Sequence, residues 1–535
     1  MKRKNIWITG LLSLLVLFMS ACGNSSTPAQ DPNSTSSTAA EGTGQPKDGG
    51  NIIIAVHEDP RVLNPLYSND RVTLTINQSL FAPLYTIEDG GEKKFVLAES
   101  LTSSEDFLTY TLKLREGLTW HDGQSLTADD IVYTMNSILD EKQNSSQRGS
   151  FVFNGKPLTT KKVDDRTVDF VLPQPSASFE AMLATLKPIP EHVFKGETDL
   201  EKSGKNSNPI GSGPFKFKEY RPGEYVTLER FDNYFGGKAR LDSVTYRIAK
   251  DPNAANLALQ NGELNMRKID PADYNKLNGT GKFNMVIYPE GRLNYMVFNF
   301  NTEALKKKEV RQAIGYALDK NELIATAYGS SEFAEPGTSI FTPDTQYQSA
   351  DHEQYNYNAD QAKELLKAAG AENLKLRLAY ANSNKIQEAQ ALVIQQKLKE
   401  VSIEVELMPL DSTAYSNMSL DPNNTKFDLS FNGYIMGVEP DAYKSLYLSD
   451  AAYNYSHYKN ADLDKLWDQA AVEMDTAKRA EQYKQIQQTI ADEMVVYPIA
   501  FDKAIIAVDK RYGGLDEARP KPVFMFEDLS KLYLN

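Results

Sequence analysis

The chain has a single cysteine, Cys22, and this residue stands at the end of an export signal. Residues 2–4 are basic, residues 6–18 form a short apolar run, and small residues lead into the Ala21-Cys22-Gly23 junction. An apolar run of this length is shorter than the roughly 20 residues that span a bilayer. We therefore interpret residues 1–21 as the signal peptide of an exported protein. Without a second cysteine the exported body forms no internal disulfide, so its own hydrophobic cores must stabilise it.

The position of Cys22 matches the bacterial lipobox, in which the cysteine receives a diacylglyceryl group and becomes the new N-terminus. Met19 stands where that pattern usually has leucine. An uncleaved anchor helix is the alternative, and it is less favoured because no apolar stretch continues beyond Cys22. We predict that lipid on Cys22 holds the protein on the extracytoplasmic face of the cell membrane of a Gram-positive bacterium.

Residues 22–48 are rich in Ser, Thr, Gly and Pro and have almost no side chains to bury. Such a segment is expected to be a flexible tether. Removing residues 1–21 takes away three positive charges, Lys2, Arg3 and Lys4, which changes the formal net charge from −14 to −17. This acidity argues against nucleic acid as a partner and against binding of anionic lipid through the body itself. The remaining body of about 485 residues is too large for one core and predicts two or three domains.

The first half of the body is rich in predicted strands, and from about residue 300 helices alternate with strands. Residues 51–56 form a continuous apolar run typical of a buried strand. Over residues 108–114 apolar and polar side chains alternate, as in a half-buried strand. Thr127 is placed to cap a helix with an apolar face. Further strands are expected within residues 166–248. Later helices are expected near Val310, after the cap residue Asn358, and between Leu463 and Met474.

No motif of catalysis or metal binding stands out. None of the five histidines has a second ligand at metal-binding spacing, and His121 fits a packing or turn role. The Gly211-Ser-Gly213 stretch lacks the frame of a nucleophile elbow, and no P-loop or dinucleotide fingerprint occurs. We therefore predict no catalytic residue, no metal and no cofactor. The 28 tyrosines suit a polar, adaptable ligand site, or simply surface packing.

Several stretches together resemble a known family. They are Tyr110-Thr-Leu-Lys-Leu-Arg-Glu-Gly-Leu-Thr-Trp-His-Asp-Gly-Gln-Ser-Leu-Thr-Ala-Asp-Asp-Ile-Val-Tyr133, Asn208-Pro-Ile-Gly-Ser-Gly-Pro-Phe215, Ala258-Leu-Gln-Asn-Gly-Glu263, Val310-Arg-Gln-Ala313 and Tyr357-Asn-Ala-Asp-Gln-Ala362. In order and content they are similar to the large bacterial extracellular solute-binding lipoproteins that feed oligopeptide and dipeptide ABC importers. The similarity extends from about residue 49 to about residue 530.

This resemblance implies a mixed α/β (α+β), periplasmic-binding-protein-like fold of the three-domain type, with two lobes that close on the ligand like a hinge. Domain I is expected to be discontinuous (49–84, 208–291 and 500–535), domain II to be inserted (85–207), and domain III (292–499) to form the second lobe. The closed protein, expected to be a monomer, would deliver a peptide to an ABC permease whose ATPase is a separate chain.

The resemblance also implies where a peptide would bind. Main-chain hydrogen bonds can bind a peptide whatever its side chains, as when a peptide pairs with the edge of a strand. In the family, one segment that binds the peptide main chain follows the first strand. Here that segment is Val62-Leu63-Asn64. The other lies in the second lobe, which here is Asn432-Gly433-Tyr434.

The α-amino group of a peptide needs a carboxylate partner when the lobes close around it. In well-known peptide-binding relatives an aspartate lies shortly before an acidic-Pro pair. Here the pair is kept as Glu439-Pro440, but Gly437 stands at the position of the aspartate. Either Glu439 or Asp441 therefore binds the amine, or the ligand has no such charge.

Three other functions stay open on the sequence. The same fold could bind a different solute, such as a metal chelate, a sugar or a signalling peptide. A surface adhesin or chaperone could keep the fold without transport, and an exported hydrolase is the least favoured of the three.

Overall fold

The computed structural model describes residues 46–88 and 91–535. The predicted signal peptide, Cys22 and most of the predicted tether lie outside these residues. Lys47, at the end of the predicted tether, forms an antiparallel bridge with Leu534, and its amide donates to the Leu534 carbonyl at 2.8 Å. Among the described residues, no helix is both long and apolar enough to cross a membrane.

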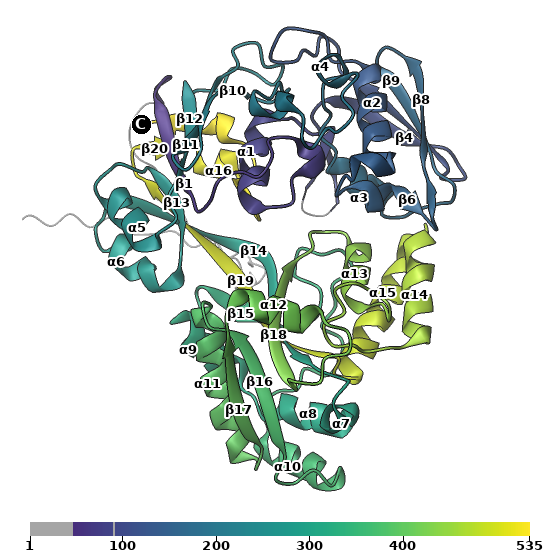
Figure 1. The fold of residues 1–535 in the computed structure, drawn as a ribbon, viewed down its shortest axis with the longest axis vertical. Helices are drawn as coiled ribbons and strands as arrows, with labels where there is room; N and C mark the ends of the chain where they lie inside the picture. The colour runs from purple at the N-terminus through teal and green to yellow at the C-terminus, as the bar shows by residue number, and fades with distance from the viewer. Residues whose placement is uncertain (1–45, 89–90) are drawn as a thin grey trace, which may run out of the picture. The chain divides into compact units, whose positions relative to one another are not determined.

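One eleven-stranded sheet continues through both lobes (Figure 1). Its strands follow the order β10-β11-β12-β1-β13-β19-β14-β18-β16-β17, with β15 paired to β19. Their bounds are β1 (Asn51–Val56), β10 (Phe215–Arg221), β11 (Tyr225–Arg230), β12 (Ser243–Ile248), β13 (Met266–Ile269), β14 (Phe283–Phe298), β15 (Ala334–Pro336), β16 (Lys375–Ala381), β17 (Glu404–Leu410), β18 (Leu429–Ile435) and β19 (Val496–Asp509).

The long strands β14 and β19 connect the lobes. They pair with each other almost end to end, while β13 joins β19 in the first lobe and β18 joins β14 in the second. Their register shifts between Pro289 and Arg292, where Gly291 has a φ of 62°. A bulge of this kind bends a strand and tolerates a left-handed residue best when it is glycine. The predicted domain border at 291–292 falls at this bulge.

The remaining elements of the first lobe are short helices and strands. The segments predicted to form domain I contain the helices α1 (Arg71–Leu80), α5 (Pro252–Gln260), α6 (Tyr274–Asn278) and α16 (Leu515–Ala518), and the short strands β20 (Tyr512–Gly513), β21 (Pro520–Lys521), β22 (Met525–Phe526) and β23 (Tyr533–Leu534). The inserted segment contains β2 (Tyr85–Ile87), β3 (Lys93–Phe95), β4 (Ala98–Ser103), β5 (Thr109–Leu114), β6 (Val152–Phe153), β7 (Lys156–Pro157), β8 (Thr159–Asp164), β9 (Thr167–Val171), α2 (Ala128–Leu139), α3 (Phe179–Ala184) and α4 (Glu191–Phe194).

Two stretches that carry the family resemblance contact each other. The Gly211 amide donates to Nδ1 of His121 at 3.1 Å, so Nε2 is the protonated nitrogen and donates to the Gly213 carbonyl at 3.0 Å. A β-carbon at Gly211 would lie 2.0 Å from the Leu80 carbonyl oxygen, so only glycine allows this close approach. Burial lowers the pKa of His121 to about 4, which keeps the ring neutral. His121 therefore connects the stretch around Trp120 with the Gly211–Gly213 stretch, a structural role of the kind expected for it.

Asp130 explains another part of the same stretch. Its carboxylate accepts from the Thr127 amide at 2.9 Å and from the Glu191 amide at 2.9 Å, and the residue is 4% exposed. The side chain thus caps α2 and ties it to α4. The helix predicted after Thr127 and the strand predicted at 108–114 are both present, as α2 and β5.

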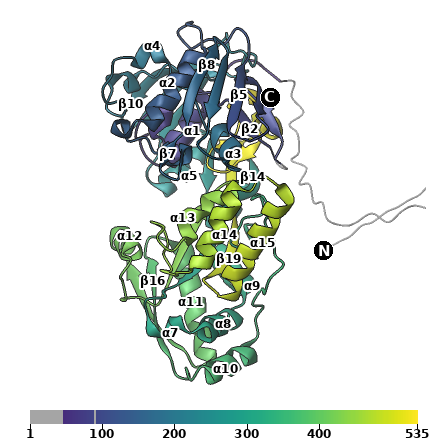
Figure 2. The same cartoon turned by 90° about the vertical axis from the view of Figure 1, so that its right-hand side faces the viewer.

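Helices cover both faces of the sheet in the second lobe (Figure 2). Their bounds are α7 (Glu303–Lys306), α8 (Lys308–Tyr316), α9 (Lys320–Tyr328), α10 (Ala359–Ala368), α11 (Lys385–Glu400), α12 (Ser412–Leu420), α13 (Lys444–Tyr447), α14 (Ala461–Val472) and α15 (Thr476–Asp492). One core packs α8 to α11 against the sheet, and a separate core packs α13 to α15 on its other face. The helices predicted after Asn358 and between Leu463 and Met474 correspond to α10 and α14.

Candidate ligand site between the lobes

A cavity of about 280 Å³ lies between the inserted segment and the second lobe. It has room for several water molecules or a short segment of ligand. The inserted segment lines it with Ile87, Gly91, Lys93, Phe107, Tyr110, Ala177, Glu180 and Ala181, and the second lobe with Gln346, Tyr347, Glu439, Glu473, Met474, Thr476 and Arg479. Beside it, the Ala177 amide donates to the Ala471 carbonyl at the end of α14, at 3.0 Å. This main-chain bond connects the two walls.

The lining is charged, with three carboxylates against two cations. Lys93 pairs with Glu180 at 2.6 Å, and Arg479 pairs with Glu439 at 2.5 Å. Glu473 accepts the Asp475 amide at 2.8 Å and has no cation within ion-pair distance among the described residues. The cavity therefore has a surplus of one negative charge, which favours a cationic group of a ligand.

Glu439, predicted to bind an amine, is buried in a pair with Arg479. The two side chains are 6% and 5% exposed, and Glu439 also accepts the Asp441 amide at 3.0 Å. Burial raises the pKa of the Glu439 carboxyl, and the Arg479 guanidinium offsets part of this effect. Glu439 thus faces the cavity with part of its charge already neutralised.

Asp441, the other predicted amine partner, interacts electrostatically with the same pair but does not line the cavity, and it has weaker partners than Glu439. Its nearest cation is Lys444, at 3.7 Å. Its Oδ1 atom is buried and accepts no hydrogen bond from any described residue. Burial raises the pKa of Asp441 as well. Gly437 has a φ of 77°, a conformation that an aspartate adopts with strain, so the backbone itself favours glycine at this position.

The strand β18 has an open edge where Asn432, Gly433 and Tyr434 were predicted to bind a peptide. It pairs with β14 from Leu429 to Ile435 but with β16 only at Leu429 and Ser430, and no other described strand takes the free edge. The Gly433 amide points to this edge and donates to Oδ1 of Asn432 at 2.7 Å. In an antiparallel strand the carbonyl of the same residue points the same way. Tyr434 is instead a core residue, whose hydroxyl donates to the Ile340 carbonyl at 2.6 Å.

The first-lobe segment Val62-Leu63-Asn64 is folded on itself. The Asn64 amide donates to the Val62 carbonyl at 2.8 Å, and the Asn64 carbonyl accepts from the Ser68 hydroxyl at 2.9 Å. Leu63 is 5% exposed within the domain I core, and Asn64 is 1% exposed. In this arrangement three of the main-chain groups predicted to bind a peptide, the Val62 carbonyl and the Asn64 amide and carbonyl, are used locally.

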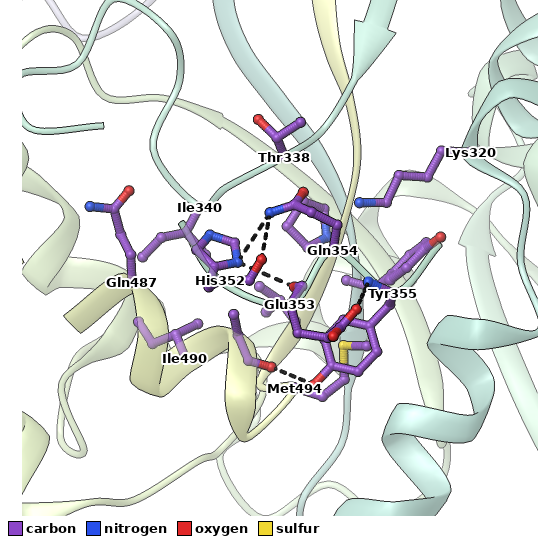
Figure 3. A pocket seen from close by; sticks show the side chains of 14 residues that line it. Lys320, Thr338, Ile340, His352, Glu353, Gln354, Tyr355, Gln487, Ile490 and Met494 are labelled. Carbon is purple, nitrogen blue, oxygen red and sulfur yellow. Dashed lines mark hydrogen bonds between the residues drawn. The ribbon is translucent and has the colours of Figure 1, made fainter. Parts of the chain in front are cut away.

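A second cavity, inside the second lobe, is too small to be the site. Its volume is about 20 Å³, enough for one water molecule. Figure 3 shows the Lys320 side chain pointing toward Gln354, with His352 beside Gln354. Lys320 donates to the Gly337 carbonyl at 2.5 Å, and burial lowers its pKa to about 8. Among the described residues, no group of three His, Cys, Asp or Glu side chains could hold a metal ion.

A buried carboxyl group lies near the bulge that separates the lobes. Asp502 on β19 accepts from Asn294 Nδ2 at 2.6 Å and from the Tyr328 hydroxyl at 2.5 Å, and Arg292 lies 3.6 Å away. Glu290 adds a nearby negative charge and is itself held by Lys268 and, at 2.7 Å, by Arg71. Burial, the largest cause, raises the pKa of Asp502 from 3.8 to about 6.

Titration of Asp502 should make the folded protein less stable as the pH rises. Because the folded protein binds this proton more tightly than the unfolded chain, the free energy of unfolding should decrease as the pH rises from about 4 to about 6, by about 2 kcal/mol. Replacing Asp502 with asparagine removes the titration. Chemical denaturation of both proteins across this range should show the wild type losing stability relative to Asp502→Asn. Parallel pH profiles would contradict this expectation.

Sequence reasoning did not identify several residues of the site. Lys93, Glu180, Gln346 and Arg479 line the cavity, and none lies in a stretch that suggested ligand binding. Arg479 is an ordinary helix residue in the sequence, 40 positions from the glutamate that it binds. Only their three-dimensional arrangement identifies them.

Comparison with known proteins agrees with this architecture. Residues 94–457 match the model of the bacterial extracellular solute-binding proteins, family 5 Middle. The chain is 32% identical to the oligopeptide-binding protein AppA of Bacillus subtilis, over 92% of this chain and 93% of that protein. It is 55% identical to the ABC transporter substrate-binding protein CtaP of Listeria monocytogenes, whose crystal structure has a TM-score of 0.89 and covers 91% of this chain and all of that one.

The structure of Bacillus subtilis AppA in complex with a nonapeptide is also similar, with 28% identity, a TM-score of 0.75, and coverage of 92% of this chain and all of that one. These likenesses confirm the two-lobed α/β fold expected from the sequence, and the family's extracellular character agrees with the predicted export. The chain belongs to family 5 of the bacterial extracellular solute-binding proteins.

Proposed function

We propose that this protein is a receptor that binds peptides between its two lobes outside the cytoplasm and delivers them to an ABC permease. It catalyses no reaction, acts as a monomer, and is held at the membrane by a diacylglyceryl group on Cys22. Two acyl chains are enough for stable attachment. The relatives named for oligopeptide binding, and the nonapeptide bound by one of them, support a peptide as the ligand.

The open edge of β18 is the observation that carries this proposal. A peptide that extends along it gains main-chain hydrogen bonds at Gly433 by displacing the Asn432 side chain, a local partner that is easily exchanged. Such bonds are the same for every peptide, so they give affinity without side-chain selectivity. The ligand binds the closed arrangement better than the open one and shifts the population toward it.

The principal test is to identify the ligand that the protein carries. Mass spectrometry of molecules released by denaturing the purified chain is expected to show a mixture of short peptides. A single non-peptide species would contradict the proposal and favour another solute on the same fold.

The surplus negative charge of the cavity supports binding of the peptide's α-amino group near Glu439 and Asp441. Asp441 has a buried oxygen free of hydrogen bonds from the described residues, whereas Glu439 already binds Arg479. N-acetylated peptides should therefore bind at least tenfold more weakly than free peptides, a difference of about 1.4 kcal/mol. Calorimetric titration of the wild type with matched pairs of peptides measures this difference.

The variants Asp441→Asn and Glu439→Gln show which carboxylate acts. The responsible variant should lose the preference for a free amine while it keeps its affinity for the acetylated peptide. If both variants retain the preference, neither residue binds the amine.

A further inference from the structure

Two side chains from the neighbouring strand, those of Asn294 and Arg292, lie over Gly433. A β-carbon at this position would lie 2.6 Å from Nη2 of Arg292 and 2.4 Å from Oδ1 of Asn294. The backbone of Gly433 lies outside the left-handed region that otherwise requires glycine. The close approach of the Asn294 and Arg292 side chains therefore leaves no room for a larger residue unless these side chains move.

The Arg292 guanidinium therefore lies over β18 at Gly433. Arg292 belongs to β14 and pairs in register with Ile435, two residues beyond Gly433. Adjacent strands are about 4.8 Å apart, and an extended arginine side chain spans that distance. The guanidinium lies above Gly433, whose amide points to the edge of β18 that the described strands leave open.

The Arg292 guanidinium makes few short contacts with other groups of the protein. Its Nε donates to Oδ1 of Asn294 at 3.3 Å and lies 3.6 Å from the Asp502 carboxylate, and both contacts are long. Among the described residues, no acceptor binds its two terminal nitrogens. The side chain is 34% exposed. Arginine has five N–H donors in a planar fork, so four of them are available for a ligand.

We propose that Arg292 binds a carboxylate of the bound peptide. Gly433, which has no side chain, leaves the space in which the guanidinium reaches the strand edge. The inference rests on the proposed function, because the carboxylate belongs to a peptide extended along β18. A guanidinium fork and a carboxylate make two parallel, charge-assisted hydrogen bonds. The carboxylate is either the C-terminus of the peptide or an acidic side chain, since both have the same chemistry.

The test uses the full chain and three peptides of otherwise identical sequence. The first has a free C-terminus and no acidic residue, the second is its C-terminal amide, and the third is the amide with one glutamate added. The wild type should bind at least one of the carboxylate-bearing peptides about tenfold or more tightly than the plain amide. Which one it prefers identifies the source of the carboxylate.

In Arg292→Gln this preference should disappear, while affinity for the plain amide changes by less than about threefold. Gly433→Ala should also weaken this preference, because its methyl group displaces the guanidinium. Arg247→Gln is the matched control: Arg247 lies on β12, pairs with one carboxylate, Glu263, at 3.3 Å, and should leave all three affinities unchanged.

Two results would overturn the proposal: equal affinity of the wild type for all three peptides, or an unchanged preference in Arg292→Gln. A wild type that binds none of the peptides would instead refute peptide binding itself, and this proposal with it. Circular dichroism of each variant confirms that it is folded before its affinities are compared.

Discussion

Replacing Arg479 with methionine is expected to lower the free energy of unfolding by about 3–5 kcal/mol and to impair ligand binding. Its guanidinium is buried against Glu439 at 2.5 Å and also donates to the Ala470 carbonyl at 3.2 Å. Removing it leaves the Glu439 carboxylate buried in the cavity wall without its cation. The destabilisation should be measured by chemical denaturation at neutral pH, where an unpaired carboxylate costs most.

The double variant Arg479→Met with Glu439→Met separates the loss of a pair from the loss of packing. Because it removes both charges, it should be more stable than Arg479→Met alone. Lys478→Met is the control, since Lys478 is the exposed neighbour on the same helix and should change stability by less than about 0.5 kcal/mol. Equal stability of the single and double variants would show that the buried carboxylate is not the cause.

Replacing Arg311 with leucine is expected to cost about 3–5 kcal/mol of stability without a direct effect on the cavity. The residue is 1% exposed, and its guanidinium lies over the Phe300 ring, 4.2 Å from the centroid. It donates hydrogen bonds to four main-chain carbonyls, those of Leu305, Lys306, Glu493 and Met494. These bonds join α7 to the end of α15, so leucine would leave buried acceptors without donors.

Thermal and chemical denaturation measure the effect of Arg311→Leu, and peptide affinity at low temperature checks that the site is intact. Arg311→Lys should recover only part of the loss, because one ammonium group cannot reach carbonyls on both sides. Lys306→Leu removes an exposed cation nearby and should be nearly neutral. A loss below about 1 kcal/mol in Arg311→Leu would mean that water satisfies the carbonyls.

Much of the local structure could be predicted from the sequence, because it depends on neighbouring residues. The alternation of apolar and polar side chains at residues 108–114 and the apolar run at 51–56 both correspond to strands. The helix that was predicted after the cap residue Thr127 begins there. The stretch around Val310-Arg-Gln-Ala313 supported the family assignment, although the structural role of Arg311 as the donor for four carbonyls was not evident from it. The role of His121 was predicted only as packing, and its two partners lie 90 and 92 residues away.

The sequence by itself predicted the export signal, and it determined the absence of internal disulfides, the family, and the position of the Glu439-Pro440 pair. The tertiary structure alone decided which polar side chains meet: Glu439 with Arg479 across 40 residues, and Asn294 with Asp502 across 208. It also decided that Arg292 lies over Gly433. The physical reason is that ion pairing, burial and the free side of a strand depend on distances between segments far apart in the chain, which the spacing of residues along it does not specify.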